Sequence, residues 1–189
     1  MKKLLMAFVV LTLATGVATA DTYIGMYAAP TATECYAGTS VYTATTVYFT
    51  AWVDTDWSGE ISAAEFYVEN FPEAAGMGVI TENWNTDLVI GVISYGIALA
   101  FNPPLSGPLA ALGSVDFFTT DANWIPADYS MYVRPSRASN GLLLVDTDGI
   151  EYQVGGGMFT FNCSNPTNCD CLEGVATDDA NWSSVKALY

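Results

Sequence analysis

The residues from Asp54 to Glu65 have the types and spacing of a calcium-binding loop. Candidate ligands with side-chain or main-chain oxygens recur along this segment: Asp54, Asp56, Ser58, Glu60 and Glu65. Gly59 occupies the position at which such a loop turns sharply. A hard cation takes six to eight oxygen ligands, and alternate residues of a tight loop can direct their oxygens to one centre. The motif makes Ca²⁺ a candidate cofactor of a chain that otherwise requires none.

The sequence around this motif fits a different structure. A loop of the EF-hand type lies between two helices, whereas residues 46–53 alternate like a strand. Glu65 would then lie on the outward face of the next strand, pointing away from the loop. The competing interpretation is a solvated acidic hairpin that turns at Ser58-Gly59. If an ion binds, Asp54, Asp56 and Ser58 are better candidates than Glu65.

Aromatic side chains are the second group that could bind a ligand, with 5 Trp, 11 Tyr and 9 Phe. We expect Trp57, Trp84 and Trp124 on outer faces or in loops, where their rings could stack on sugars. Packing in the core or at its rim is the competing interpretation for aromatic residues in a β-protein.

Composition excludes several classes of function. The chain of 189 residues has 20 acidic and 5 basic residues and no histidine. Without histidine there is no Ser-His or Cys-His dyad and no imidazole metal site. The acidic balance argues against nucleic acid as a partner. The carboxylates would allow a glycosidase-like pair, but no spacing selects one, so we expect no enzyme and keep a small secreted hydrolase as an alternative.

Residues 1–20 have the pattern of a secretory signal peptide. Lys2 and Lys3 precede an apolar stretch, and residues 18–20 form a small-residue cleavage site. Removing the two lysines changes the formal net charge from −15 to −17. We therefore expect a secreted, periplasmic or cell-surface protein with no transmembrane helix in the mature chain.

Four cysteines follow in this oxidising compartment: Cys35, Cys163, Cys169 and Cys171. Four cysteines allow three pairings, and sequence cannot choose among them. We favour Cys35–Cys163, which leaves Cys169 and Cys171. The competing pairing closes Cys163 onto Cys169 or Cys171. A zinc site is the minor alternative.

Alternation with period two dominates the mature region and predicts the elements that must position these residues. Residues Val47, Phe49, Ala51 and Val53 share one face of a strand, and Ala64, Phe66 and Val68 share a face of the next. Other predicted strands are residues 23–27, 79–82, 88–94, 97–101, 112–118, 131–134, 142–146, 150–154 and 158–162. About nine or ten short strands separated by turn residues predict an all-β protein, an immunoglobulin-like or jelly-roll β-sandwich.

Residues 88–115 contain no charged residue. Prolines and glycines interrupt this stretch, and its uninterrupted part, residues 88–101, is too short for a helical membrane span. We expect a pair of strands buried in the sandwich.

The composition changes after Cys163, where residues 164–178 read as a loose linker. The end of the chain has apolar residues that one short docked helix could use: Trp182, Val185, Leu188 and Tyr189. A frayed tail is the alternative. The predicted organisation is a leader at 1–20, a sandwich at 21–163 and a cysteine-containing linker and tail at 164–189.

Two segments resemble a group of uncharacterised exported bacterial proteins that have a cohesin-like or immunoglobulin-like sandwich. They are residues 61–68, which resemble an early strand of that domain, and residues 182–189, which are similar to a short C-terminal W-x-x-V-K-x-L-Y signature. The resemblance implies a non-enzymatic surface or secreted role and supplies no catalytic residue.

The sequence thus predicts an exported, non-catalytic subunit that acts as a structural, adhesive or self-assembling component. Its expected partners are further copies of itself or a surface protein or glycan. A carbohydrate-binding module that uses exposed Trp and Tyr is the first alternative.

Overall fold

The structure, a computed structural model, describes residues 22–54, 57 and 59–171. It is built from strands and one short 3₁₀ turn, η1 (Pro166–Asn168). The strands are β1 (Tyr23–Tyr27), β2 (Tyr36–Ala37), β3 (Ala44–Trp52), β4 (Ile61–Glu69), β5 (Gly78–Trp84), β6 (Leu88–Val92), β7 (Gly96–Leu105), β8 (Leu109–Thr119), β9 (Tyr129–Arg134), β10 (Leu143–Asp146), β11 (Glu151–Gln153), β12 (Gly155–Gly156) and β13 (Met158–Phe161).

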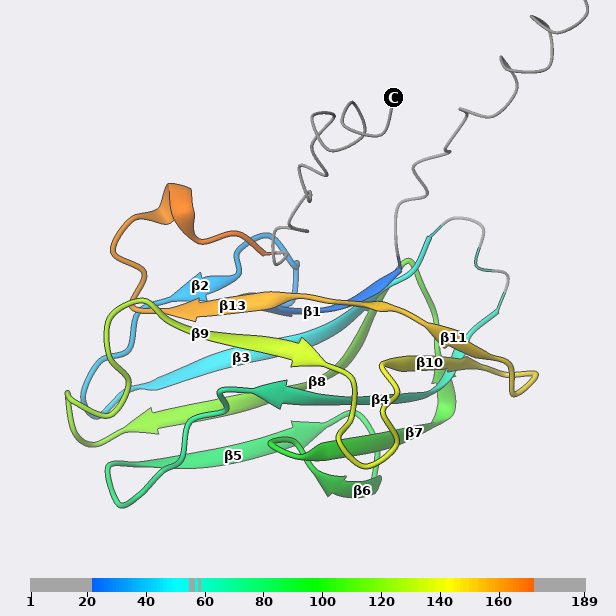
Figure 1. Cartoon of the computed structure of the whole chain (residues 1–189), viewed down its shortest axis with the longest axis horizontal. Helices are drawn as coiled ribbons and strands as arrows, with labels where there is room; N and C mark the ends of the chain where they lie inside the picture. The colour runs from blue at the N-terminus through cyan, green and yellow to red at the C-terminus, as the bar shows by residue number, and fades with distance from the viewer. Residues whose placement is uncertain (1–21, 55–56, 58, 172–189) are drawn as a thin grey trace, which may run out of the picture.

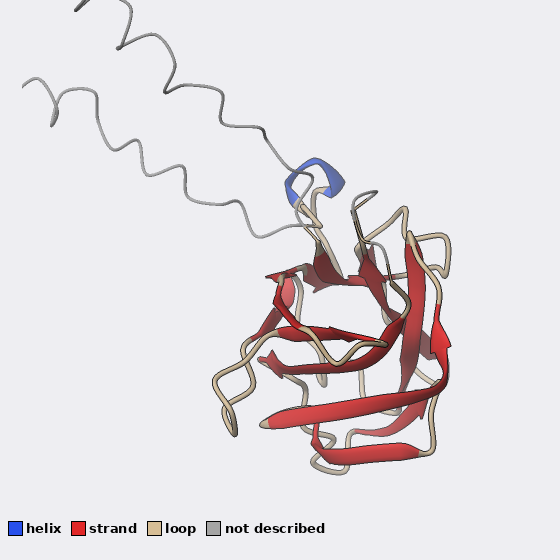
Figure 2. Ribbon diagram, turned by 90° about the vertical axis from the view of Figure 1, so that its right-hand side faces the viewer, coloured by secondary structure: helices blue, strands red, loops and turns tan. Residues whose placement is uncertain are grey.

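The strands form two sheets, which confirms the predicted all-β sandwich. Sheet one has the order β12-β1-β3-β8-β5. Sheet two runs β11-β10-β4-β9-β13-β2, and β7 joins it along β4 and carries β6 on its other side. Strands β5 and β6 lie together at one border of the molecule, opposite β1, β2 and β13 (Figure 1). Figure 2 shows η1 outside the two layers of strands.

Aromatic residues from both sheets fill the space between them. Phe49 on β3 stacks against Phe66 on β4 with ring centroids 5.8 Å apart. Phe117 on β8 meets Phe161 on β13 edge to face at 5.0 Å. All four side chains are buried, and each contributes about 1.5–3 kcal/mol by leaving water. The faces that alternation assigned to the core on β3 and β4 are the faces that pack here.

All eleven segments predicted as strands are strands in the structure, with shifted ends. The two that alternation missed, β2 and β12, are two residues long and too short to show a period. Residues 155–157 were expected to be a turn, but Gly155 and Gly156 pair in parallel with β1. A Cβ on Gly156 would lie 2.0 Å from the Val133 carbonyl oxygen, so this approach of two strands requires glycine.

The prediction that residues 88–101 form two buried strands is wrong for the first strand. β7 buries Ile97, Leu99 and Phe101, but every residue of β6 is exposed. An uncharged strand shows the same pattern whether another sheet or an outside partner is meant to cover it, so sequence alone does not separate the two. No helix in the described part of the chain is long and apolar enough to cross a membrane.

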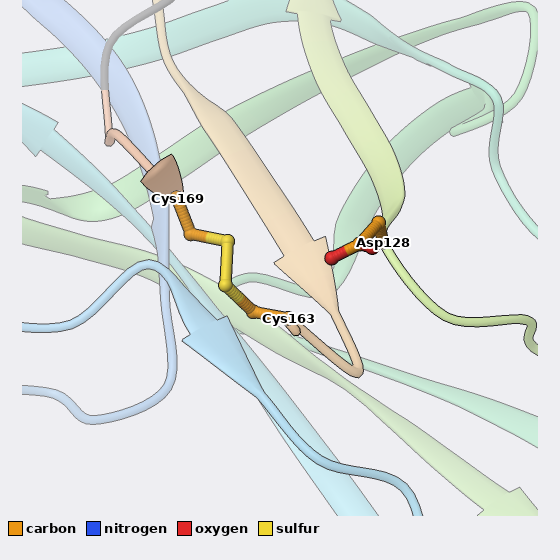
Figure 3. Close-up of side chains that lie close together, drawn as sticks. All are labelled: Asp128, Cys163 and Cys169. Atoms are coloured by element: carbon orange, nitrogen blue, oxygen red, sulfur yellow. A yellow bond between two sulfur atoms is a disulfide. The ribbon is translucent and has the colours of Figure 1, made fainter. Parts of the chain in front are cut away.

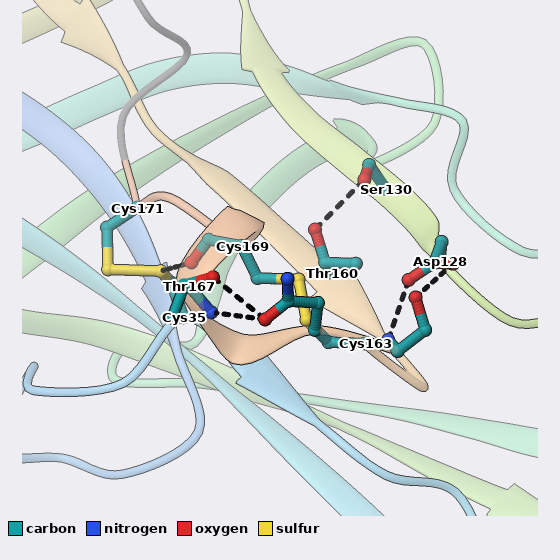
Figure 4. Close-up of a disulfide and its surroundings, with 10 residues drawn as sticks. Cys35, Asp128, Ser130, Thr160, Cys163, Thr167, Cys169 and Cys171 are labelled. Carbon is teal, nitrogen blue, oxygen red and sulfur yellow. Dashed lines mark hydrogen bonds between the residues drawn. A yellow bond between two sulfur atoms is a disulfide. The ribbon is translucent and has the colours of Figure 1, made fainter.

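The favoured disulfide, Cys35–Cys163, is also wrong. Cys163 pairs with Cys169 across η1 (Figure 3), which is the competing pairing, and Cys35 pairs with Cys171 (Figure 4). No described cysteine is free, so the zinc alternative has no thiolate. The two bonds attach residues 164–171 to the sandwich, where a loose linker was expected.

The two disulfides differ in how much they restrict the unfolded chain. Cys35 and Cys171 are 136 residues apart, whereas Cys163 and Cys169 are 6 apart. Chain entropy assigns about 5 kcal/mol to the long closure and about 2 kcal/mol to the short one. We predict that Cys35→Ser/Cys171→Ser lowers the free energy of unfolding by more than Cys163→Ser/Cys169→Ser does. Chemical denaturation followed by tryptophan fluorescence measures both, and equal losses would contradict the assignment.

Candidate functional site

The most exposed apolar element in the described chain is β6. Its outward side chains Leu88, Ile90 and Val92 are 56%, 66% and 57% exposed. On the opposite face, Val89 is 37% exposed although its partner on β7, Leu99, is buried. We call residues Leu88–Val92 with their unpaired backbone side the β6 edge. Contiguous exposed apolar surface of this kind marks an interaction site more often than scattered apolar residues do.

Trp84 fixes the place where the chain enters β6. It ends β5 in sheet one, and its ring lies 5.4 Å from Phe49 of that sheet and 6.1 Å from Phe66 of sheet two. Its Nε1 donates a hydrogen bond to Glu82 Oε2 at 2.8 Å. The ring is therefore packed against both sheets at the point where the chain leaves one for the other.

Residues 85–87 then carry the chain from sheet one to sheet two. The Asn85 N–H donates to the Leu112 carbonyl at 3.0 Å, and Asn85 Nδ2 donates to the Ala111 carbonyl at 2.7 Å. Thr86 Oγ1 donates to the Ala100 carbonyl and accepts from the Leu88 N–H. These bonds tie the crossing to β8 on one side and to β7 on the other, so the start of β6 is fixed in both sheets.

The second backbone side of β6 pairs with no described strand, because β6 pairs only with β7. Natural proteins usually protect such edges with charges, prolines or very short strands. The other border strands follow this rule: β5 carries Glu82, β11 carries Glu151, and β2 and β12 have two residues each. Among the described border strands longer than two residues, β6 alone lacks a charge.

A groove of about 590 Å³ adjoins the start of the β6 edge. Residues from Trp84 to Leu88 line one side of it, and residues 100–102 line the other. Its walls mix the apolar Leu88 with the polar side chains of Asn85, Asp87 and Asn102. The β6 edge and this groove form one continuous surface.

The three tryptophans predicted to bind sugars lie in different surroundings. Trp124 is buried, with Nε1 donating to the Glu73 carbonyl at 2.7 Å, so its predicted exposure is wrong. Trp84 is half-buried against the core, as described above. Trp57 is half-buried against Tyr152, with ring centroids 4.3 Å apart. Stacking of a sugar on Trp57 or Trp84 stays a prediction.

The predicted calcium ligands are not brought together by the described residues. The Asp54 N–H donates to Thr22 Oγ1 at 3.3 Å, directly after β3. Glu60 accepts from Ser106 Oγ at 3.0 Å, whereas Glu65, in the middle of β4, accepts from Ser139 Oγ at 2.5 Å. Asp56 and Ser58 lie outside the described residues. Calcium binding therefore stays a prediction that concerns the loop rather than Glu65.

The loop after β3 packs on the second acidic hairpin, between β10 and β11, whose Val-Asp-Thr-Asp sequence repeats that of residues 53–56. A Cβ on Gly59 would lie 3.2 Å from the Cβ of Asp146, and Trp57 contacts Tyr152. The Asp146 carboxylate accepts from the N–H groups of Ile150 and Asp148, each at 2.9 Å, and from the Tyr152 hydroxyl at 3.0 Å. Asp146 thus organises its own hairpin.

A third acidic group lies beside the short disulfide (Figure 3). Asp128, Cys163 and Cys169 converge, but both sulfurs are in the disulfide and cannot act as thiolate ligands. The Asp128 carboxylate instead accepts from the Ser164 N–H at 2.7 Å and from Ser164 Oγ at 2.8 Å (Figure 4). The Ser164 N–H bond, and then the hydroxyl bond, lower the pKa of Asp128. This cluster holds the chain between β13 and η1 in place.

The apolar residues of the tail, Trp182, Val185, Leu188 and Tyr189, lie outside the described residues. Docking of the tail stays a prediction. Sequence reasoning missed the β6 edge as a site, although one signal was present: both faces of residues 88–92 are free of polar side chains.

No family model and no curated protein matches this chain. Solved structures similar to it include a cohesin module from a family 33 glycoside hydrolase of Clostridium perfringens, with 12% identity and a TM-score of 0.44 over 76% of this chain and 98% of that one. The CaCohA2 chain or its partner in a CaDoc0917–CaCohA2 complex shows 13% identity and a TM-score of 0.45 over 74% and 97%. A non-cellulosomal cohesin from the archaeon Archaeoglobus fulgidus shows 12% identity and a TM-score of 0.38 over 75% and 89%. The two-sheet architecture rests on the strand pairing itself, and the signature at residues 182–189 lies outside the described residues.

The carboxylate of Asp146 should make the stability of the protein depend on pH. Its pKa is lowered, first by the Ile150 N–H and further by the Tyr152 hydroxyl and the Asp148 N–H. The ionised form is therefore favoured by folding: the stabilisation is complete above the unfolded pKa of about 3.9 and is lost as the pH falls through the lower folded value. We predict that Asp146→Asn lowers the Tm at pH 7 and that the difference from wild type shrinks at pH 3.

Thermal unfolding followed by circular dichroism at both pH values measures this effect. Glu151→Gln, which removes an exposed carboxylate from the adjacent β11, is the matched control and should leave the Tm close to that of wild type. An equal loss of Tm at pH 7 and pH 3 would show that Asp146 acts by shape rather than by charge.

Proposed function

We propose that this protein is a non-catalytic subunit that works outside the cytoplasm and binds another protein chain through the β6 edge. It serves there as a structural, adhesive or self-assembling component. The observation that carries the proposal is the exposure of Leu88, Ile90 and Val92 on an uncharged border strand with a free backbone side.

Two kinds of interaction are available at such an edge. Covering an exposed Leu, Ile or Val side chain contributes about 1.5–3 kcal/mol when the side chain is fully buried. The free N–H and C=O groups of β6 can continue the sheet by pairing with an added strand. Main-chain pairing supplies affinity, and the apolar side chains select a partner strand of similar character.

The two disulfides support the location. Four cysteines, all paired, are typical of proteins that fold in an oxidising compartment outside the cytoplasm. The acidic composition, with a formal charge of −15, keeps such a protein soluble and limits non-specific association.

Site-specific crosslinking in the producing cells tests the proposal. A photo-reactive amino acid, p-benzoylphenylalanine, replaces Ile90 in one variant and Val79 in a control variant. Val79 is also an exposed apolar residue on a border strand, 55% exposed on β5. We predict that irradiation joins the position-90 variant to a protein chain in high yield and leaves the position-79 variant mostly unlinked. Equal or absent crosslinking at the two positions would contradict a binding site at β6.

A further inference from the structure

The β6 edge has the chemistry of its own best partner. We propose that β6 pairs antiparallel with β6 of a second copy of this chain, so that sheet two continues across the two molecules. The inference rests on the proposed function and names the partner at that same site.

Charge is the first argument for a second copy. The chain carries 20 acidic residues against 5 basic ones, so two copies repel one another over most of their surfaces. Residues 88–115 contain no charged residue, and both strands of the β6–β7 hairpin lie within them. The β6 edge is therefore the border at which two copies can approach with the least repulsion, and it offers an uncharged apolar strand to an identical one.

The register of the pair follows from the faces of the strand. Leu88, Ile90 and Val92 pair with Ala100, Ala98 and Gly96 of β7 and share the outer face of the hairpin. An antiparallel pair centred on Ile90 places each Leu88 opposite Val92 of the other copy and the two Ile90 residues opposite each other. All five residues of β6 are then paired, and the outer apolar faces of both copies lie on the same side of the joined sheet.

The same register keeps acidic groups apart. Asp87 directly precedes β6 and is exposed. In a pair centred on Ile90 it falls opposite Ile93 of the other copy rather than opposite a carboxylate. Like charges directly across a strand pair are destabilising, and this arrangement avoids them.

The geometry of the pair is closed. A two-fold axis at Ile90 uses the same edge on both molecules, so the contact forms a dimer and leaves no second copy of this edge free. Strand β6 has five residues, so the contact is small and we expect association to depend on concentration in the micromolar range or above.

Sedimentation velocity of the protein as processed by the producing cell, over a range of concentrations, tests the pairing. We expect a concentration-dependent dimer for wild type. Ile90→Glu would place two carboxylates face to face at the axis and should raise the dissociation constant by at least about tenfold. The matched control Val79→Glu adds the same charge to the other long border strand and should leave the dimer unchanged. Circular dichroism confirms that both variants are folded.

A cysteine at the axis tests the register directly. In the proposed pair the two residues at position 90 face each other with Cα atoms roughly 4.5–5.5 Å apart, within reach of a disulfide. Ile90→Cys should therefore form a covalent dimer in air, visible on a non-reducing gel, whereas Val79→Cys should not.

Three results would overturn the pairing: a wild-type monomer at every concentration, association of Ile90→Glu equal to wild type, or loss of association on removal of residues 172–189 with Ile90→Glu still associating. The last result would make the tail of a neighbour the occupant. A monomer in solution together with crosslinking in cells to a different protein would reject the second copy but retain the proposed function. Absence of both would reject the two together.

Discussion

The contact of Trp84 with Phe49 and Phe66 is the point on which the rest of this border depends. It joins the last residue of β5 to the aromatic core of both sheets. The next three residues must then cross from sheet one to sheet two, and Asn85 and Thr86 hold that crossing by hydrogen bonds to β8 and β7. Because the crossing is short and fixed, β6 begins at the outer border of sheet two.

The position of β6 has a physical cost that the rest of the fold does not offset. A border strand with no charge leaves both its backbone groups and three large apolar side chains in water. The opposite border of the molecule is covered differently, because the Cys35–Cys171 bond attaches residues 164–171 beside β2 and β13 (Figure 4). One border is thus closed by covalent bonds and the other is left for a partner.

Alternation of side chains was sufficient to predict the strands, because burial on one face gives a period of two that a single sequence displays. It predicted the inward faces of β3 and β4 for the same reason. It missed β12, where two glycines pair with β1 and have no side chains to alternate. It also assigned β6 to the interior, since an apolar strand awaiting a partner and a buried strand have the same composition.

The candidate site was less accessible to sequence reasoning than the fold. The loop motif at residues 54–65 has the spacing of a cation site, yet Glu65 belongs to the middle of β4 and bonds to Ser139. Trp124 was expected outside but is buried beside Phe117, because the turn that carries it folds back over the core. The cysteine pairing depends on where β2 meets β13, and a two-residue strand gives no signal of that contact. Long-range proximity decides each of these cases, and local sequence does not encode it.

Hydrogen–deuterium exchange of the wild-type protein at low and high concentration tests the central claim most directly. If the β6 edge is the binding surface between copies, amides within residues 88–92 exchange more slowly as concentration rises, while amides of β5 exchange at the same rate throughout. Exchange in β6 that does not change with concentration, or protection that arises at β5 instead, would contradict the account.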